Sequence, residues 1–150
     1  VSQNRGANQH DRIVDGVKIG MKLSIVWGII SVVLMMLFAR ALVALLSGSK
    51  EVIVLDNGSQ YLILNAPFYA VLGFLLILRN SLQGLGKKIV PLISSVIEFF
   101  GKVIFSWICI PYLGYFGVMI CEPVIWCLMC IQLFYSFFNN PYIRNKDKNI

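Results

Sequence analysis

The chain has 150 residues, of which 58% are hydrophobic and only 13% are charged. Soluble domains carry nearer a quarter charged residues, so this composition excludes an ordinary soluble globular protein. The net charge of +6 would suit a nucleic-acid ligand, but the basic residues occupy short segments between long apolar stretches. A nucleic-acid-binding domain would gather them on one face. We therefore predict a membrane protein without a nucleic-acid partner.

Four apolar stretches divide the chain, at about residues 19–46, 61–85, 89–110 and 117–138. A helix crosses a bilayer with about 20 residues, which rise about 1.5 Å each. The sequence thus predicts an all-α membrane protein with four transmembrane helices. Residues 1–18 form a polar segment, in which Asp11 or Asp15 is expected to cap the helix that leads into the first span. Residues 139–150 form a polar tail.

The basic residues give the spans an orientation. Nine of the thirteen lie before or at the start of the first span, between the second and third, or in the tail: Arg5, Arg12, Lys18, Lys22, Lys87, Lys88, Arg144, Lys146 and Lys148. Four spans place these segments on one side of the membrane, and basic loops stay in the cytoplasm. We predict a multi-pass protein of the cell membrane, plasma or inner, with both chain ends cytoplasmic.

Three features between the polar ends have structural interpretations. Arg40 lies inside the first span, where its long side chain can extend to the outer interface. The segment after Glu51 fits either a short interfacial helix or the start of the next span. Pro67 lies inside the second span and is expected to kink it, because proline has no N–H to donate.

Polar residues inside the spans are the candidate functional residues. Glu98 and Lys102 are four residues apart and so share one helix face. A lone charge at such depth costs at least about 2.5 kcal/mol, so the pair should face the protein interior. It either binds a coupling ion or a charged substrate, or only ties helices together. Glu122 has the weaker claim, because it is expected nearer the outer interface.

The cytoplasmic end of the second span adds three more candidates, Arg79, Asn80 and Gln83. The second and third spans are antiparallel neighbours, so Arg79 is expected to reach the level of Glu98.

Catalytic and metal-binding patterns are missing from the sequence. His10 is the single histidine and is expected to be a solvated loop residue, and the four cysteines are expected to pack as small apolar side chains. No nucleophile–base set or phosphate-binding loop is present either. We predict neither an enzyme nor a metal site.

Four short motifs in order resemble those of the multidrug and toxic compound extrusion (MATE) family, over its last four of twelve spans. They are QNRGA followed by Asp11-Arg12-Ile13, the RNSLQGLG run from Arg79 to Gly86, the PLISSVIE run from Pro91 to Glu98, and the PYLGYFG turn from Pro111 to Gly117. Each motif alone is weak, but the four in order with matching spacing are fairly specific.

The resemblance implies a secondary transporter built from two six-helix lobes, of which this chain would supply most of the second. Such proteins export drugs or amphipathic organic cations in exchange for H⁺ or Na⁺ by alternating access, with no other cofactor. The implied partners are the lipid bilayer, a small-molecule substrate and the first lobe. Some members carry an acidic residue near the position of Leu72, which is apolar here. Coupling would then fall to Glu98 or to the first lobe.

Two other functions remain open from the sequence. Flippases for lipid-linked sugars have a similar architecture and would line their cavity with basic residues. A four-helix membrane adaptor without transport activity would tolerate Glu98→Gln.

Overall fold

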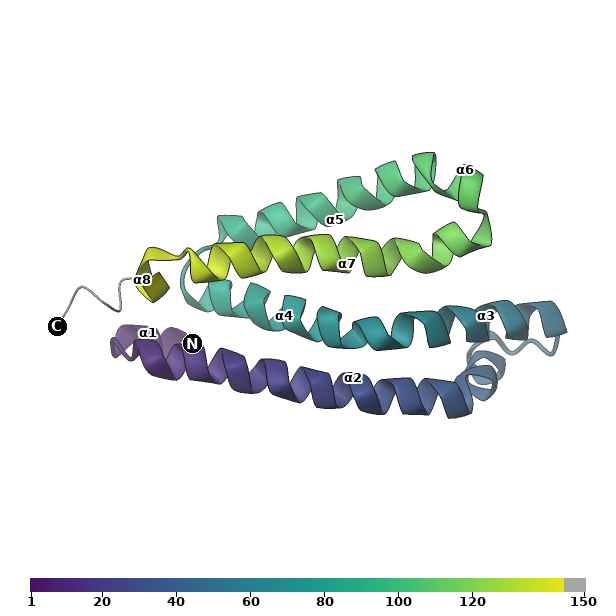
Figure 1. Ribbon diagram of the computed structural model, residues 1–150, viewed down its shortest axis with the longest axis horizontal. Coiled ribbons are helices and arrows are strands. Elements are labelled where there is room, and N and C mark those ends of the chain that lie inside the picture. Colours follow the sequence, from purple (N-terminus) through teal and green to yellow (C-terminus); the bar gives the residue numbers. More distant parts are fainter. Residues whose placement is uncertain (145–150) are drawn as a thin grey trace.

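The computed structural model describes residues 1–144, which form helices and no strand (Figure 1). The elements are α1 (Ser2–Gly6), α2 (His10–Ser47), α3 (Val52–Asn65), the 3₁₀ turn η1 (Ala66–Phe68), α4 (Tyr69–Gly84), α5 (Ile89–Ile108), α6 (Ile110–Leu113), α7 (Tyr115–Phe138) and α8 (Pro141–Arg144). Lys146 and Lys148, in the predicted basic tail, lie outside the described residues.

α2 is one continuous helix that begins before the apolar stretch. Its N-cap is Gln9, so the prediction that Asp11 or Asp15 caps the helix is wrong. Asp11 lies in the first turn instead, where a negative charge interacts favourably with the helix dipole. The helix ends at Gly48, whose left-handed φ of 63° favours glycine and lets its N–H donate to the carbonyl of Ala44.

The second crossing is broken at proline. α3 begins at Val52, so the segment after Glu51 is the start of this crossing and not a separate interfacial helix. Pro67 lies in η1, where the chain changes from α3 to α4 through a short 3₁₀ turn. Because proline has no N–H to donate to the preceding turn, the helix is interrupted at Pro67, the position at which the sequence predicts a kink.

The last two crossings form a helical hairpin. α5 ends at Ile108, and the expected tight turn contains the one-turn helix α6 followed by Gly114, whose φ of 56° reverses the chain. Glycine reaches this backbone region without steric cost. Pro123 lies inside α7 and leaves the helix continuous.

The crossings lie side by side in the order α5, α7, α4 with α3, and α2 (Figure 1). α7 is therefore central and is the most buried of the four. The main apolar core is formed by residues of α2, α4 and α7, and its fully buried side chains are Ile13, Leu78, Leu82, Ile125, Met129, Leu133 and Phe137. α1 and α8 meet at the same end of the bundle (Figure 1).

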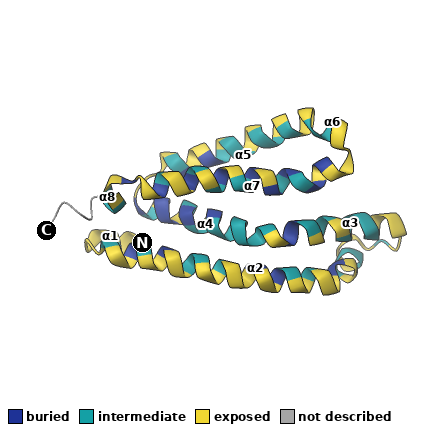
Figure 2. Cartoon of the chain, in the orientation of Figure 1, coloured by how far each residue is buried: buried dark blue, intermediate teal, exposed yellow. Residues whose placement is uncertain are grey.

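Most of the apolar surface faces outward. Among the described residues, four segments are long and apolar enough to cross a membrane: α2, α3 with α4, α5, and α7. Exposed residues run along the outer faces of α2 and α5 (Figure 2), including Leu23, Leu37, Phe99 and Ile104. The predicted all-α membrane architecture with four spans is confirmed.

Candidate functional site

A charged bridge joins α5 to α7. The ammonium of Lys102 lies 3.0 Å from a carboxylate oxygen of Glu98 and 2.9 Å from one of Glu122. All three side chains are about two-thirds buried. The Glu98–Lys102 pair therefore forms as its spacing predicts. Glu122 is the partner that links the two helices. Its weaker claim to a functional role stays a prediction.

The hairpin geometry explains why the bridge forms. Lys102 and Glu122 lie at nearly equal distances along the chain from the turn at α6, so antiparallel packing brings them to one level. Gly101 leaves room for the side chain of Ile125 on α7, since a methyl group at position 101 would lie only 2.7 Å from Cδ1 of Ile125. Glu98 follows from helix spacing alone, being one turn before Lys102.

The bridge carries one net negative charge when both carboxylates are ionised. Tyr61, on α3, is partly buried, and α3 packs against α7, so a third element approaches the site. A net charge inside an apolar span is costly, and binding one proton would remove it. The cluster is thus a site at which protonation changes the charge balance between two helices.

The C-terminal end of α4 contributes one of its three predicted residues. Arg79 donates a short hydrogen bond to the hydroxyl of Ser95, which lies on α5 about one turn before Glu98. It therefore reaches the expected level but contacts the serine. Asn80 and Gln83 are exposed, and neither side chain has a hydrogen bond to another described residue. The structure does not bring these two residues to the bridge.

A chain of partly buried hydrogen bonds lies between the bridge and the α8 end of the bundle. The hydroxyl of Ser94, which is fully buried, donates to the side-chain oxygen of Gln132 over 2.6 Å. The amide nitrogen of Gln132 donates in turn to the hydroxyl of Ser136 over 3.3 Å. Sequence reasoning did not place these residues in a site. Their distances along the chain from the α6 turn differ by about one helical turn, so the sequence alone does not pair Ser94 with Gln132.

A buried asparagine ties the broken crossing to α7. The side-chain nitrogen of Asn65 donates to the carbonyl of Tyr61 over 2.9 Å and to that of Met119 over 3.2 Å. Asn65 is almost fully buried and directly precedes η1. The bond to Met119 holds α3 against α7 one turn from Glu122.

Two predicted surface residues have partners in the structure. His10 is partly buried, and its Nδ1 lies 2.8 Å from the carbonyl oxygen of Tyr142, whose ring packs against the imidazole. The prediction of a solvated loop histidine is therefore wrong. Arg40 forms an exposed ion pair with Asp56 on α3, at 3.0 Å. Within residues 1–144, no group of three or more His, Cys, Asp and Glu residues is arranged to hold a metal ion.

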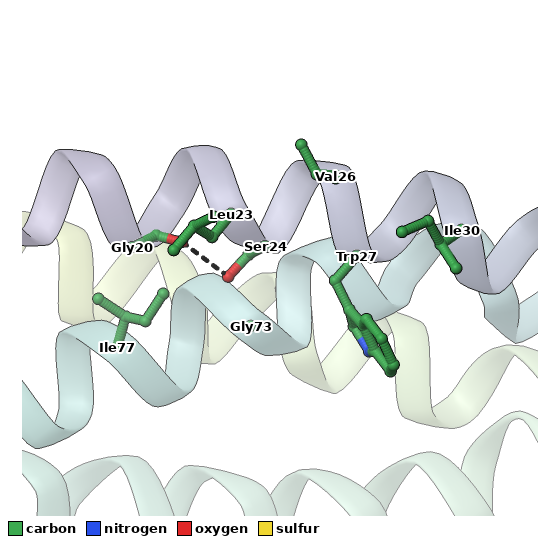
Figure 3. A pocket seen from close by; sticks show the side chains of 8 residues that line it. All are labelled: Gly20, Leu23, Ser24, Val26, Trp27, Ile30, Gly73 and Ile77. Atoms are coloured by element: carbon green, nitrogen blue, oxygen red, sulfur yellow. Dashed lines mark hydrogen bonds between the residues drawn. The ribbon is translucent and has the colours of Figure 1, made fainter.

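The α2–α4 interface contains an apolar groove of about 530 Å³ (Figure 3). Its lining residues are Gly20, Leu23, Ser24, Val26, Trp27, Ile30, Gly73 and Ile77. The hydroxyl of Ser24 donates to the carbonyl of Gly20 within the same helix, so it is already satisfied (Figure 3). The groove lining contains no charged residue. The candidate coupling site is therefore on α5 and α7 and not here.

A bundle of four membrane-length helices with a charged bridge between two of them defines a polytopic membrane protein with a polar site inside its spans. The family model MatE matches residues 1–108, which cover α1 to the end of α5. The chain therefore belongs to the MatE family of membrane transporters, which is a family of transporters and not of enzymes. No curated protein and no solved structure matches the chain significantly.

Proposed function

We propose that the chain works within the second lobe of a proton-coupled antiporter that exports drugs or amphipathic organic cations by alternating access. Family membership supports a transporter of small molecules across a lipid bilayer. The observation that supports the coupling is the bridge of Lys102 between Glu98 and Glu122 inside the spans. We place the protein in the cell membrane with both ends cytoplasmic, because the basic segments share one side.

The two carboxylates have different roles in this proposal. Glu98 shares a helix with Lys102, so its protonation leaves the α5–α7 contact intact. Glu122 provides the contact between helices, and losing its charge would release α7 from Lys102. We therefore assign Glu98 as the proton carrier and Glu122 as the anchor. A proton on Glu98 makes the cluster neutral, which lowers the cost of enclosing it in an apolar environment.

A proton fits this site better than a sodium ion does. The ammonium of Lys102 already occupies the space between the carboxylates, and sodium would have to displace it. Hard cations bind through several oxygen ligands, whereas a proton needs one carboxylate oxygen. A net negative bridge also favours an organic cation as substrate over the anionic substrate of a lipid-linked sugar flippase.

The test is transport by the complete transporter in proteoliposomes, with the fluorescent cation ethidium as substrate. An imposed proton gradient should drive ethidium transport in the wild type. Glu98→Gln, which mimics the protonated side chain, should abolish gradient-driven transport while ethidium exchange persists. Glu51→Gln is the matched control, because Glu51 is exposed outside the spans and should leave transport unchanged.

Other outcomes would overturn parts of the proposal. Proton-driven transport that survives in Glu98→Gln removes this residue from coupling. If proton-driven transport is lost in Glu122→Gln but retained in Glu98→Gln, the coupling proton is assigned to Glu122 instead. Transport driven by a sodium gradient and indifferent to a proton gradient replaces the proton as the coupling ion.

A further inference from the structure

A small cavity with several polar residues in its lining lies at the cytoplasmic end of the α5–α7 hairpin. It has a volume of about 240 Å³, and its lining residues are Lys87, Val90, Ser136, Asn139, Asn140 and Pro141. This volume holds several water molecules. Lys87 is the charged residue of this lining, so the cavity does not concentrate metal cations.

Asn140 places a buried amide beside the cavity. Its side chain is only 4% exposed, and its oxygen accepts a hydrogen bond from the N–H of Tyr142 over 3.1 Å. The side-chain nitrogen is buried and has no acceptor among the described residues. An unpaired buried donor costs about 1–3 kcal/mol, so this amide is a polar group that the packing leaves unsatisfied in the present conformation.

A polar path leads from this cavity toward Glu98. Ser136 lines the cavity and accepts a hydrogen bond from Gln132, which accepts one from Ser94. Ser94 and Glu98 are four residues apart on α5, so they are neighbours on one helix face. Three hydrogen-bonded side chains thus connect the cavity to the helical turn that carries the coupling carboxylate.

The polar residues of this path differ from their neighbours on α7, which are apolar. Met129 and Leu133, which flank Gln132 on the buried face of this helix, are apolar and almost fully buried. A leucine at position 132 would suit such an environment, and polar residues inside spans are commonly parts of ion pathways or proton relays.

We propose that the Ser94–Gln132–Ser136 chain lines the cytoplasmic route of the coupling proton, and that the Ser94–Gln132 hydrogen bond is the point where the route is closed. This inference rests on the proposed coupling role of Glu98. Ser94 is fully buried, so water does not pass this point in the present conformation. When α5 and α7 separate there, water from the cavity can reach Glu98.

The transfer itself is a simple protonation. A hydronium ion in the hydrated route gives its proton to a carboxylate oxygen of Glu98 and leaves as water. Glu98 pairs directly with Lys102 on α5, which also pairs with Glu122 on α7. On α4, Arg79 contacts Ser95, about one turn from Glu98, and on α3 the titratable Tyr61 lies near the bridge. Ser94 and Gln132 are positioning residues in this scheme, because they hold water and do not titrate.

The experiment compares net proton-driven ethidium transport with ethidium exchange in the complete transporter. Gln132→Leu should slow proton-driven transport roughly tenfold, the effect of losing about one buried hydrogen bond from the route. Exchange, which moves no net proton, should stay at the wild-type rate. Gln132→Asn keeps an amide and should retain most of the driven rate. Gln60→Leu is the matched control, since Gln60 is exposed on α3.

The outcomes separate this inference from the proposed function. If proton-driven transport in Gln132→Leu equals that of the wild type while Glu98→Gln has lost it, the proposed route is wrong and the proposed coupling site stands. If Glu98→Gln also keeps driven transport, the coupling site itself fails. If exchange is lost in both Gln132→Leu and Gln132→Asn, Gln132 has a structural role and the route is overturned.

Discussion

Two helix interfaces of similar length are built on opposite principles. At the α2–α4 interface small residues let the backbones approach, and a methyl group added at Gly28 would lie 2.8 Å from Cβ of Ala70. At the α5–α7 interface polar side chains meet, with the Lys102 bridge toward the α6 turn and the Ser94–Gln132 bond toward the α8 end of the bundle.

The difference indicates which pair can change its packing. Close backbone contact is held by dispersion over many atoms and has one good geometry. A charged bridge depends on the protonation of its members and can therefore exist in two states. We infer that α2 and α4 move as one rigid pair, while α5 and α7 form the adjustable contact. Four substitutions, ordered by expected effect, test this contrast.

Lys102→Met should have the largest effect. It leaves Glu98 and Glu122 facing each other without a cation, and breaking a buried ion pair costs at most about 3–5 kcal/mol. Transport should fall below roughly a tenth of the wild-type rate, with less protein in the membrane. Adding Glu122→Gln should restore part of the expression. Lys50→Met, at an exposed outer position, is the control. Normal transport in Lys102→Met would show that the bridge is not required.

Gly28→Ala tests the rigid interface. The added methyl group collides with Ala70, and overpacking of this kind costs about 1–3 kcal/mol. The melting temperature of the purified transporter should fall. Gly16→Ala, in the same helix but with nothing within 4 Å of the new methyl group, should leave it unchanged or raise it. Ala70→Gly should rescue Gly28→Ala. Equal melting temperatures for Gly16→Ala and Gly28→Ala would argue against close packing as the basis of this interface.

Asn65→Ala should weaken the contact between α3 and α7. It removes the hydrogen bond to the carbonyl of Met119, and such bonds inside membranes contribute about 1 kcal/mol. A modest drop in melting temperature is expected. Asn80→Ala, at an exposed position without a side-chain hydrogen bond, serves as the stability control. A drop of the same size in both variants would remove the special role of Asn65.

Arg40→Gln should have the smallest effect. The pair with Asp56 is largely exposed, and surface ion pairs contribute about 0–1 kcal/mol. A double-mutant cycle with Asp56→Asn should give a coupling free energy below about 1 kcal/mol that decreases with added salt. A larger coupling free energy would mean that this ion pair contributes substantially to holding α2 and α3 together.

The lengths of the apolar stretches and the positions of glycine and proline made much of the fold predictable. The helix stop at Gly48 and the break at Pro67 depend on local backbone chemistry, so the sequence alone indicates them. The Glu98–Lys102 pair follows from spacing within one helix. Contacts between helices were harder to predict from the sequence, because they depend on the register in which two helices pack. The partners of Lys102 at Glu122, of Ser94 at Gln132 and of His10 at Tyr142 all required the packed structure.

The most direct test of the central claim is proton release on substrate binding. Ethidium is added to the complete, detergent-solubilised transporter in weakly buffered solution, and a pH indicator reports released protons. If Glu98 carries the coupling proton and the substrate cation displaces it, the wild type should release a proton on binding, and Glu98→Gln should bind ethidium without release. Equal release from both proteins would contradict the assignment of Glu98, and no release from the wild type would contradict proton coupling at this bridge.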